Sequence, residues 1–218
     1  VEQQDGALGN AGWALVSAGV AEKLFTYNDR EQIVPALAKR AVRADDDTWT
    51  ITLQPGRKFS DGTPVSAAVV AAALTRTNEI NSRYAQTLGK MTVTAVNELT
   101  LSISTEITTP IMESVLCEFA FVIYKQNPDG NFVYTGPYAI SGHAVNHMDL
   151  EPNTHYPWGT KQRIPIQIKK YTSGAEVSAA IQAGEIDIAF NLPSTEIAPL
   201  NGHNGLTVTS FNVGYMYM

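Results

Sequence analysis

The chain has 218 residues, of which 44% are hydrophobic and 17% are charged, and this composition suits one or two globular domains with a sizeable core. Its formal net charge of -6, without basic clusters, argues against nucleic acid or an anionic membrane surface as a partner. No apolar run approaches the roughly 18–20 residues that a membrane-spanning helix needs.

The first predicted element is a helix over Ala11–Phe25, where apolar residues recur every three or four positions and Asn10 can cap the start. Pro35–Ala38 is predicted to form a short turn or helical piece after a loop. The next segment, Trp49–Leu53, alternates apolar and hydroxyl residues. It is therefore predicted to be a half-exposed strand that ends at Pro55-Gly56.

The loop Phe59–Pro64, with the sequence FSDGTP, superficially resembles a phosphate-binding loop, but its glycines and its lysine are in the wrong order. Asp61-Gly62 is instead typical of a tight turn, in which the glycine takes a positive φ. We therefore predict that this loop is scaffold and not a site. Ser66 then suits the N-cap of a helix over 67–77.

The rest of the chain is predicted to be mainly strands with short helices. Alternating residues predict a hairpin of Met91–Val96 and Leu99–Ser104, joined by a tight turn. The same reasoning predicts helices at Ile111–Leu116, Glu176–Ala183 and Thr195–Leu200, and strands at Phe119–Tyr124, Tyr138–Ser141, His147–Glu151, Ile164–Tyr171, Ile186–Phe190 and Val208–Met218.

This order of elements predicts a mixed α/β (α+β) fold. Residues 1–27 and 159–218 are predicted to form the core subdomain of one lobe, and residues 28–158 an inserted, sheet-rich subdomain. The chain begins at Val1 without a methionine and stops at Met218 inside a strand pattern. We therefore expect a processed N-terminus and a truncated chain.

Motifs for metal and hydrolytic chemistry are weak. His143, His147 and His155 lie close together, but their spacing matches no recurring metal motif, so we predict no metal site. The chain has neither a GxSxG elbow nor an SxxK motif. The single cysteine, Cys117, lies in an apolar context and is predicted to be a small buried hydrophobe. We predict no catalytic residues.

Aromatic residues are numerous, and those beside irregular loops can line a cleft, because ligand pockets are mainly apolar and aromatic. The most site-like place is the start of the first predicted helix, where Trp13 follows the flexible segment Gly9–Gly12. A helix N-terminus offers unpaired N–H groups to a carboxylate or another anion.

The order of motifs resembles that of the family 5 extracellular solute-binding proteins of ATP-driven importers, which include oligopeptide-, dipeptide- and nickel-binding members. Two departures are Tyr134, where a glycine is usual, and the extra Pro157 between two aromatic residues. Six stretches in sequential order make the resemblance specific: VAEKLFTYN, IVPALAKRAVRADDDTWTITLQPGRKFSDGTPVSAAVV, AVNELTLSI, YTGPYAI, LEPNTHYPWG and AAIQAGEIDIAF.

The resemblance implies the first lobe of a two-lobe periplasmic binding protein-like fold, which contains the inserted subdomain. Family members are roughly twice as long, so the second lobe is expected to be absent from this chain. In the family, the ligand lies between two lobes that close around it. The resemblance therefore places a ligand-binding set toward the cleft, formed by Asn10, Trp13, Glu118, Tyr134, Thr135, Asn212, Tyr215 and Tyr217.

We therefore predict the substrate-binding component of an ABC importer, without cofactor or catalysis. It would capture a short peptide or a nickel or other metal chelate by domain closure and deliver it to a membrane permease. Such a protein is expected in the periplasm or lipid-anchored on the extracellular surface. An isolated lobe should bind ligand weakly and self-associate through its exposed cleft wall. A solute-sensing domain of a regulator and a hydrolase remain as alternatives.

Overall fold

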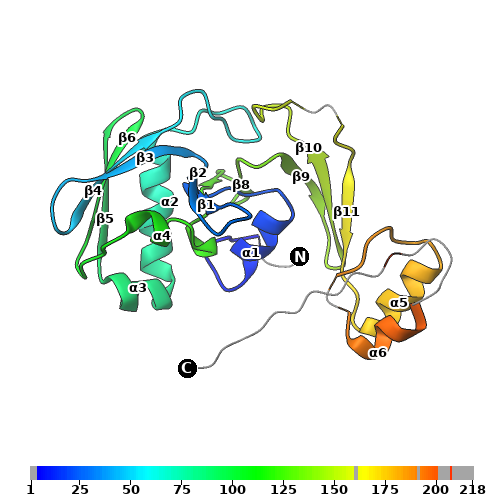
Figure 1. Ribbon diagram of the computed structural model, residues 1–218. Helices are drawn as coiled ribbons and strands as arrows, with labels where there is room; N and C mark the ends of the chain where they lie inside the picture. Colours follow the sequence, from blue (N-terminus) through cyan, green and yellow to red (C-terminus); the bar gives the residue numbers. More distant parts are fainter. Residues whose placement is uncertain (1–3, 160–161, 191, 201–206, 208–218) are drawn as a thin grey trace. The chain divides into compact units, whose positions relative to one another are not determined.

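The computed structural model of the protein describes residues 4–159, 162–190, 192–200 and 207 (Figure 1). The chain divides into two compact units, residues 1–168 and 169–218. Helices and strands are mixed, which confirms the predicted mixed α/β (α+β) class. The predicted division into residues 1–27 with 159–218 and an inserted 28–158 stays a prediction.

The largest sheet of the first unit has four antiparallel strands in the order β3-β4-β6-β5, namely β3 (Ala38–Arg43), β4 (Thr48–Leu53), β6 (Thr100–Thr105) and β5 (Met91–Asn97). The strand predicted at Trp49–Leu53 is confirmed, and its apolar residues are buried while its threonines are half-buried. The predicted hairpin corresponds to β5 and β6. The short turn or helical piece predicted at Pro35–Ala38 is a bend of two residues, Ala36 and Leu37. Its predicted ends are wrong, because Pro35 ends strand β2 (Ile33–Pro35) and Ala38 begins β3.

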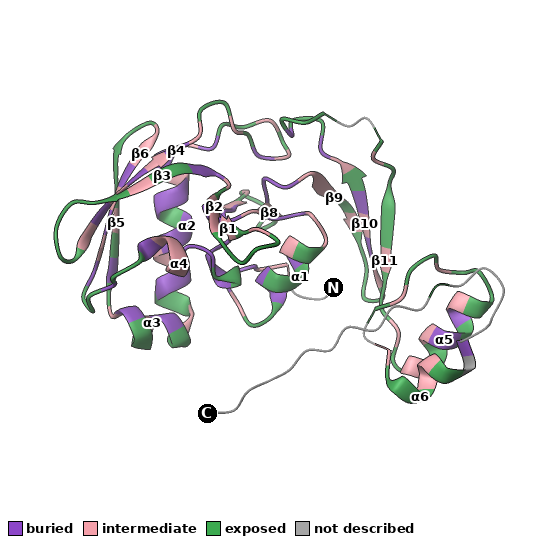
Figure 2. Cartoon of the chain, in the orientation of Figure 1, coloured by how far each residue is buried: buried purple, intermediate pink, exposed green. Residues whose placement is uncertain are grey.

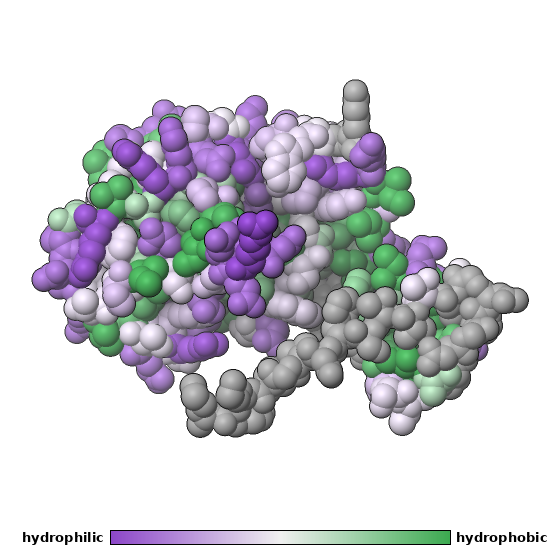
Figure 3. Space-filling model, in the orientation of Figure 1, coloured by the Kyte–Doolittle hydropathy of each residue, from purple (hydrophilic) through white to green (hydrophobic). Residues whose placement is uncertain are grey.

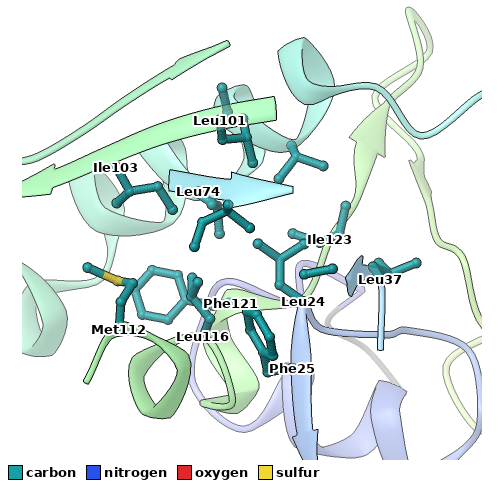
Figure 4. Close-up of a cluster of buried hydrophobic side chains, with 14 of the residues drawn as sticks. Leu24, Phe25, Leu37, Leu74, Leu101, Ile103, Met112, Leu116, Phe121 and Ile123 are labelled. Carbon is teal, nitrogen blue, oxygen red and sulfur yellow. The ribbon is translucent and has the colours of Figure 1, made fainter. Parts of the chain in front are cut away.

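Helix α2 (Ala67–Ile80) packs against this sheet, and α3 (Ser82–Leu88) follows it. The predicted cap is confirmed, since the Ser66 hydroxyl accepts the Val69 N–H at 3.4 Å. Buried residues run along α2 and the central strands (Figure 2). Figure 4 shows the resulting core, where Leu74 of α2 lies among side chains of the sheet and of α4 (Met112–Val115).

A second sheet has the order β11-β10-β9, and two shorter hairpins complete the unit. The predicted strands at 138–141, 147–151 and 164–171 correspond to β9, β10 and β11, although β11 is shorter than expected. The bounds of these elements are β9 (Tyr138–His143), β10 (His147–Pro152), β11 (Ile166–Lys169), β1 (Phe25–Tyr27) paired with β2, and β7 (Lys125–Gln126) paired with β8 (Phe132–Val133).

The helix predicted over Ala11–Phe25 is much shorter than expected. Helix α1 (Ala11–Ser17) ends before Gly19, which has a φ of +71°. The N–H groups of the next two residues then bond back to the carbonyl of Leu15. A positive φ at glycine closes a helix in this way, so the chain turns and reaches Phe25 as the start of β1.

Two predicted strands are wrong. Phe119–Tyr124 contains the short 3-10 helix η1 (Phe119–Phe121) and then extended backbone outside any sheet. Its residues from Ala120 onward are all buried, and a continuous apolar run does not distinguish a strand from other buried structure. The described part of 186–190 forms no strand, and Phe190 is 80% exposed. The strand predicted at Val208–Met218 lies outside the described residues.

The second unit holds α5 (Gly174–Gln182), α6 (Ser194–Ile197) and the 3-10 helix η2 (Ala198–Leu200), which confirms two predicted helices. The Ser173 hydroxyl accepts the Glu176 N–H at 3.2 Å and caps α5. Gly184, with a φ of +70°, follows the helix end as predicted. In the described part of the chain, no helix has the length and apolar character required to cross a membrane.

Candidate functional site

The candidate site lies where α1 meets η1 in the first unit (Figure 1). Gly12 of α1 lies so close to η1 that a β-carbon there would overlap the carbonyl oxygen of Phe119. A glycine at this position therefore lets the two elements touch. Trp13, the next residue, is 48% exposed, and Phe119 is 40% exposed. We call Asn10, Trp13, Tyr84, Glu118 and Phe119 the α1–η1 surface.

Asn10 is exposed and occupies the N-cap position of α1, as predicted, but its side chain makes no capping hydrogen bond. The backbone explains this, since Asn10 has a φ of -95° and a ψ of 4°, whereas a capping residue takes extended angles. The Ala11 N–H donates to the Leu8 carbonyl. Ligand contact by Asn10 and Trp13 stays a prediction.

Glu118 is exposed, and the Tyr84 hydroxyl donates a hydrogen bond to its Oε2 atom at 3.0 Å. Burial and this hydrogen bond to a carboxylate raise the pKa of Tyr84 to about 12. The Tyr84 ring also packs on Phe121, with 4.8 Å between the ring centroids. Tyr84 thus holds one oxygen of the carboxylate in place. Ligand contact by Glu118 stays a prediction.

Lys23 lies beneath this surface and is only 4% exposed. Its ammonium group donates to the Cys117 carbonyl at 2.5 Å and lies 4.3 Å from the centre of the Phe119 ring. Burial lowers the pKa of Lys23, and attraction to Cys117 and Glu118 offsets only part of that effect. The Lys23 side chain is therefore held between the Cys117 carbonyl and the Phe119 ring.

Cys117 is 3% exposed, and burial raises the pKa of its thiol. The prediction of a small buried hydrophobe is confirmed, because such a thiol has neither the exposure nor the low pKa of a nucleophile. Among the described residues, no group of three His, Cys, Asp or Glu side chains is placed to hold a metal ion.

Tyr134 and Thr135 are buried, with exposed fractions of 2% and 0%. The Tyr134 hydroxyl donates to the Gln4 carbonyl and accepts the Gly6 N–H at 3.0 Å, so it anchors the segment that leads into α1. The hydroxyl of Thr135 has no hydrogen-bond partner among the described residues. Their contact with a ligand stays a prediction.

Asn212, Tyr215 and Tyr217, the remaining predicted site residues, lie outside the described residues. The structure places Trp13 on α1 and Glu118 directly before η1, which contacts α1, while Tyr134 bonds to Gly6. Sequence reasoning missed Tyr84, Lys23 and Phe119. A lysine inside the apolar stretch VAEKLF was the one signal that pointed to any of them.

The FSDGTP loop forms the predicted tight turn, and its role as scaffold stays a prediction. Asp61 accepts hydrogen bonds from the backbone and the hydroxyl of Thr63, at 3.1 and 2.7 Å, and its other oxygen lies 2.5 Å from the ammonium nitrogen of Lys125. Gly62 has a φ of +86°, the conformation that the turn prediction requires.

Comparison with known proteins identifies related sequences. Residues 32–218 match the family described as bacterial extracellular solute-binding proteins, family 5 Middle. The chain is 29% identical over 204 residues to the periplasmic murein peptide-binding protein MppA of Escherichia coli, and 25% identical over 199 residues to the nickel-binding protein NikA of Staphylococcus aureus. These alignments cover 79% and 89% of this chain, but 38% and 40% of the relatives, so the chain spans about two fifths of their length.

Solved structures show the same fold. The nickel ABC transporter protein of Bacillus halodurans matches with a TM-score of 0.81 and 25% identity, over 88% of this chain and 42% of that protein. The murein tripeptide binding protein MppA of Escherichia coli matches with a TM-score of 0.75 and 25% identity, over 93% of this chain and 46% of that protein.

Proposed function

This chain belongs to the bacterial extracellular solute-binding proteins of family 5, and we propose that it is part of the substrate-binding component of an ABC importer. The family match over residues 32–218 carries the proposal. The names of the relatives support two ligand classes, since they include proteins that bind murein peptide, D,D-dipeptide and nickel.

The α1–η1 surface supports a ligand that combines an apolar part with an amine. Trp13 and Phe119 offer exposed aromatic faces, and Glu118 offers an oriented carboxylate. Pockets for small molecules commonly pair apolar walls with a few placed polar groups. A peptide fits this chemistry through its side chains and its N-terminal ammonium group, and we therefore favour a short peptide over a nickel or other metal chelate.

The proposed mechanism is capture by closure of two lobes, followed by delivery to a membrane permease, with no bond made or broken. The proposed location is the periplasm or the extracellular surface through a lipid anchor. In this scheme the α1–η1 surface is one wall of the cleft. Ligand binding would stabilise the closed form because only that form contacts the ligand on both sides.

Self-association of this chain through the same wall is a further part of the proposal. Trp13 and Phe119 are 48% and 40% exposed, and exposed apolar side chains favour association. Sedimentation velocity at rising concentration tests this. A single monomeric species at the highest concentration would contradict it.

Calorimetric titration of the full-length gene product tests the ligand. The probes are murein tripeptide and Ni(L-His)2, with free L-histidine as the control for the chelate. We expect heat from the tripeptide and none from L-histidine, and we expect Trp13→Ala to weaken the binding. The proposal fails if neither these probes nor a panel of di- and tripeptides binds at millimolar concentration.

A further inference from the structure

The buried ammonium group of Lys23 lies behind one of the exposed aromatic rings of the α1–η1 surface. Its nitrogen is 4.3 Å from the centre of the Phe119 ring and donates to the Cys117 carbonyl at 2.5 Å. Lys23 is 4% exposed, whereas Phe119 is 40% exposed. One face of the ring is therefore occupied by a cation from inside the protein, and the rest of the ring is left for a ligand.

No ion pair cancels the charge of Lys23 within the part of the chain that the structure describes. Burial lowers the pKa of Lys23, but both of its contacts favour the charged amine, because a carbonyl oxygen accepts its hydrogen and a ring face attracts a cation. Glu118 is exposed, so water and salt screen its charge more than they screen that of a buried group. The Phe119 ring is thus backed by a positive charge.

A cation behind the ring changes what the ring can bind. The face of an aromatic ring normally attracts a cation, because its quadrupole is negative there. A ligand cation on the opposite face of Phe119 would lie about 8–9 Å from the Lys23 ammonium group, twice the observed distance of 4.3 Å to the ring centre. Repulsion at that separation, at the effective dielectric constant of a protein surface, lowers affinity roughly tenfold.

We propose that Lys23 is a specificity-determining residue of the α1–η1 surface, which makes it select peptides that place an uncharged side chain against Phe119 over peptides that place a basic one there. This inference rests on the proposed function, since it names which peptides the same surface prefers. The ligand's ammonium group is directed to Glu118 and its uncharged side chain to the adjacent ring. Figure 3 shows hydrophobic and hydrophilic residues mixed across the first unit, which suits such a division of contacts.

Calorimetric titration of the full-length gene product with matched tripeptides tests this selectivity. The probes are trialanine with arginine at the first, second or third position, and the same three peptides with citrulline in place of arginine. Citrulline has nearly the shape of arginine but carries a neutral urea group, whereas the arginine guanidinium group stays charged. At one position or more, the citrulline peptide should bind the wild type about tenfold more tightly than the arginine peptide.

Two variants remove the charge of Lys23 and guard against one of them failing to fold, which circular dichroism checks. Lys23→Gln keeps a donor for the Cys117 carbonyl, and Lys23→Met keeps only the apolar stem. Either variant should reduce the preference for citrulline at the selective position by at least about fivefold. Lys39→Gln is the matched control, because Lys39 is an exposed lysine of β3 outside the α1–η1 surface, and it should leave the preference unchanged.

Two results would overturn the proposal while peptides still bind, so that the proposed transport function stands. The first is a preference that differs by less than about twofold between the wild type and the folded Lys23 variants. The second is equal binding of the arginine and citrulline peptides at all three positions of the wild type. If none of the tripeptides binds at millimolar concentration, this proposal also fails, and murein tripeptide and Ni(L-His)2 then decide the proposed function separately.

Discussion

The close approach of α1 to η1 predicts that Gly12→Ala destabilises the protein. The added β-carbon would overlap the Phe119 carbonyl oxygen and would lie 2.7 Å from the Gly6 carbonyl oxygen and 2.8 Å from the Phe119 carbonyl carbon. All three atoms belong to the backbone and cannot swing aside as a flexible side chain can. Relief of the overlap therefore requires α1 to move away from η1.

The loss of stability in Gly12→Ala is the difference between two opposed effects. Overpacking of a well-packed interior costs about 1–3 kcal/mol, and we take the upper end because backbone atoms are involved. Alanine favours a helix interior over glycine by about 1 kcal/mol. The free energy of unfolding should therefore fall by about 2 kcal/mol. With a urea dependence of about 2 kcal/mol/M, the unfolding midpoint falls by about 1 M.

Urea unfolding monitored by circular dichroism measures this effect. Ala14→Gly is the matched control, because Ala14 lies on the exposed face of the same helix and reports the helix propensity alone. It should lower stability by about 0.5–1 kcal/mol. If Gly12→Ala instead raised stability by the amount that Ala14→Gly lowers it, propensity would be the whole effect and the close approach would be refuted.

Three further predictions concern the scaffold loop and the ligand. Burial raises the pKa of Asp61, but hydrogen bonds from Lys125 and Thr63 outweigh this and hold the pKa below its ordinary value. Asp61→Asn should therefore lower the free energy of unfolding by about 1 kcal/mol at pH 7. This difference from the wild type should disappear as the pH falls below about 3.9, where the Asp61 carboxylate becomes protonated. Urea titrations that gave the same difference at every pH would contradict this. Trp13→Ala should weaken ligand binding by the full-length gene product at least about tenfold in calorimetry. Trp158→Ala, which changes a side chain that is 80% exposed, should leave the ligand affinity unchanged. Equal losses of affinity in the two variants would refute the role of Trp13. This chain alone should bind murein tripeptide with a dissociation constant above about 1 μM, because one wall of a pocket buries only part of a ligand. Submicromolar binding would contradict the proposal that two lobes enclose the ligand.

Strands and helix ends could be predicted from the sequence where they depend on residues close together in the chain. The alternation at Trp49–Leu53 predicted a strand, because one face of the sheet is buried and the other is half-buried. Ser66 and Gly184 predicted a helix start and a helix end, because a cap depends on residues within one turn of it.

Prediction failed where distant packing decides the structure. The apolar spacing of Ala11–Phe25 continues through Gly19, but the chain leaves the helix there. Gly136, far along the sequence, approaches the backbone of Gly19 and Val20, and its own N–H bonds to the Val20 carbonyl. This contact depends on residues more than a hundred positions apart, so the periodicity of one segment could not reveal it.

The sequence by itself determined the fold class, the family and the tight turn of the FSDGTP loop, because ordered motifs and turn chemistry are properties of short stretches. Only the tertiary structure decided which side chains meet. The Tyr84 hydroxyl reaches Glu118 across 34 positions, and the Lys23 ammonium group reaches the Cys117 carbonyl across 94. Such pairs form because Leu24, which follows Lys23, packs in one hydrophobic core with residues of α3 and η1. The burial that results also raises the pKa of Tyr84 and lowers that of Lys23.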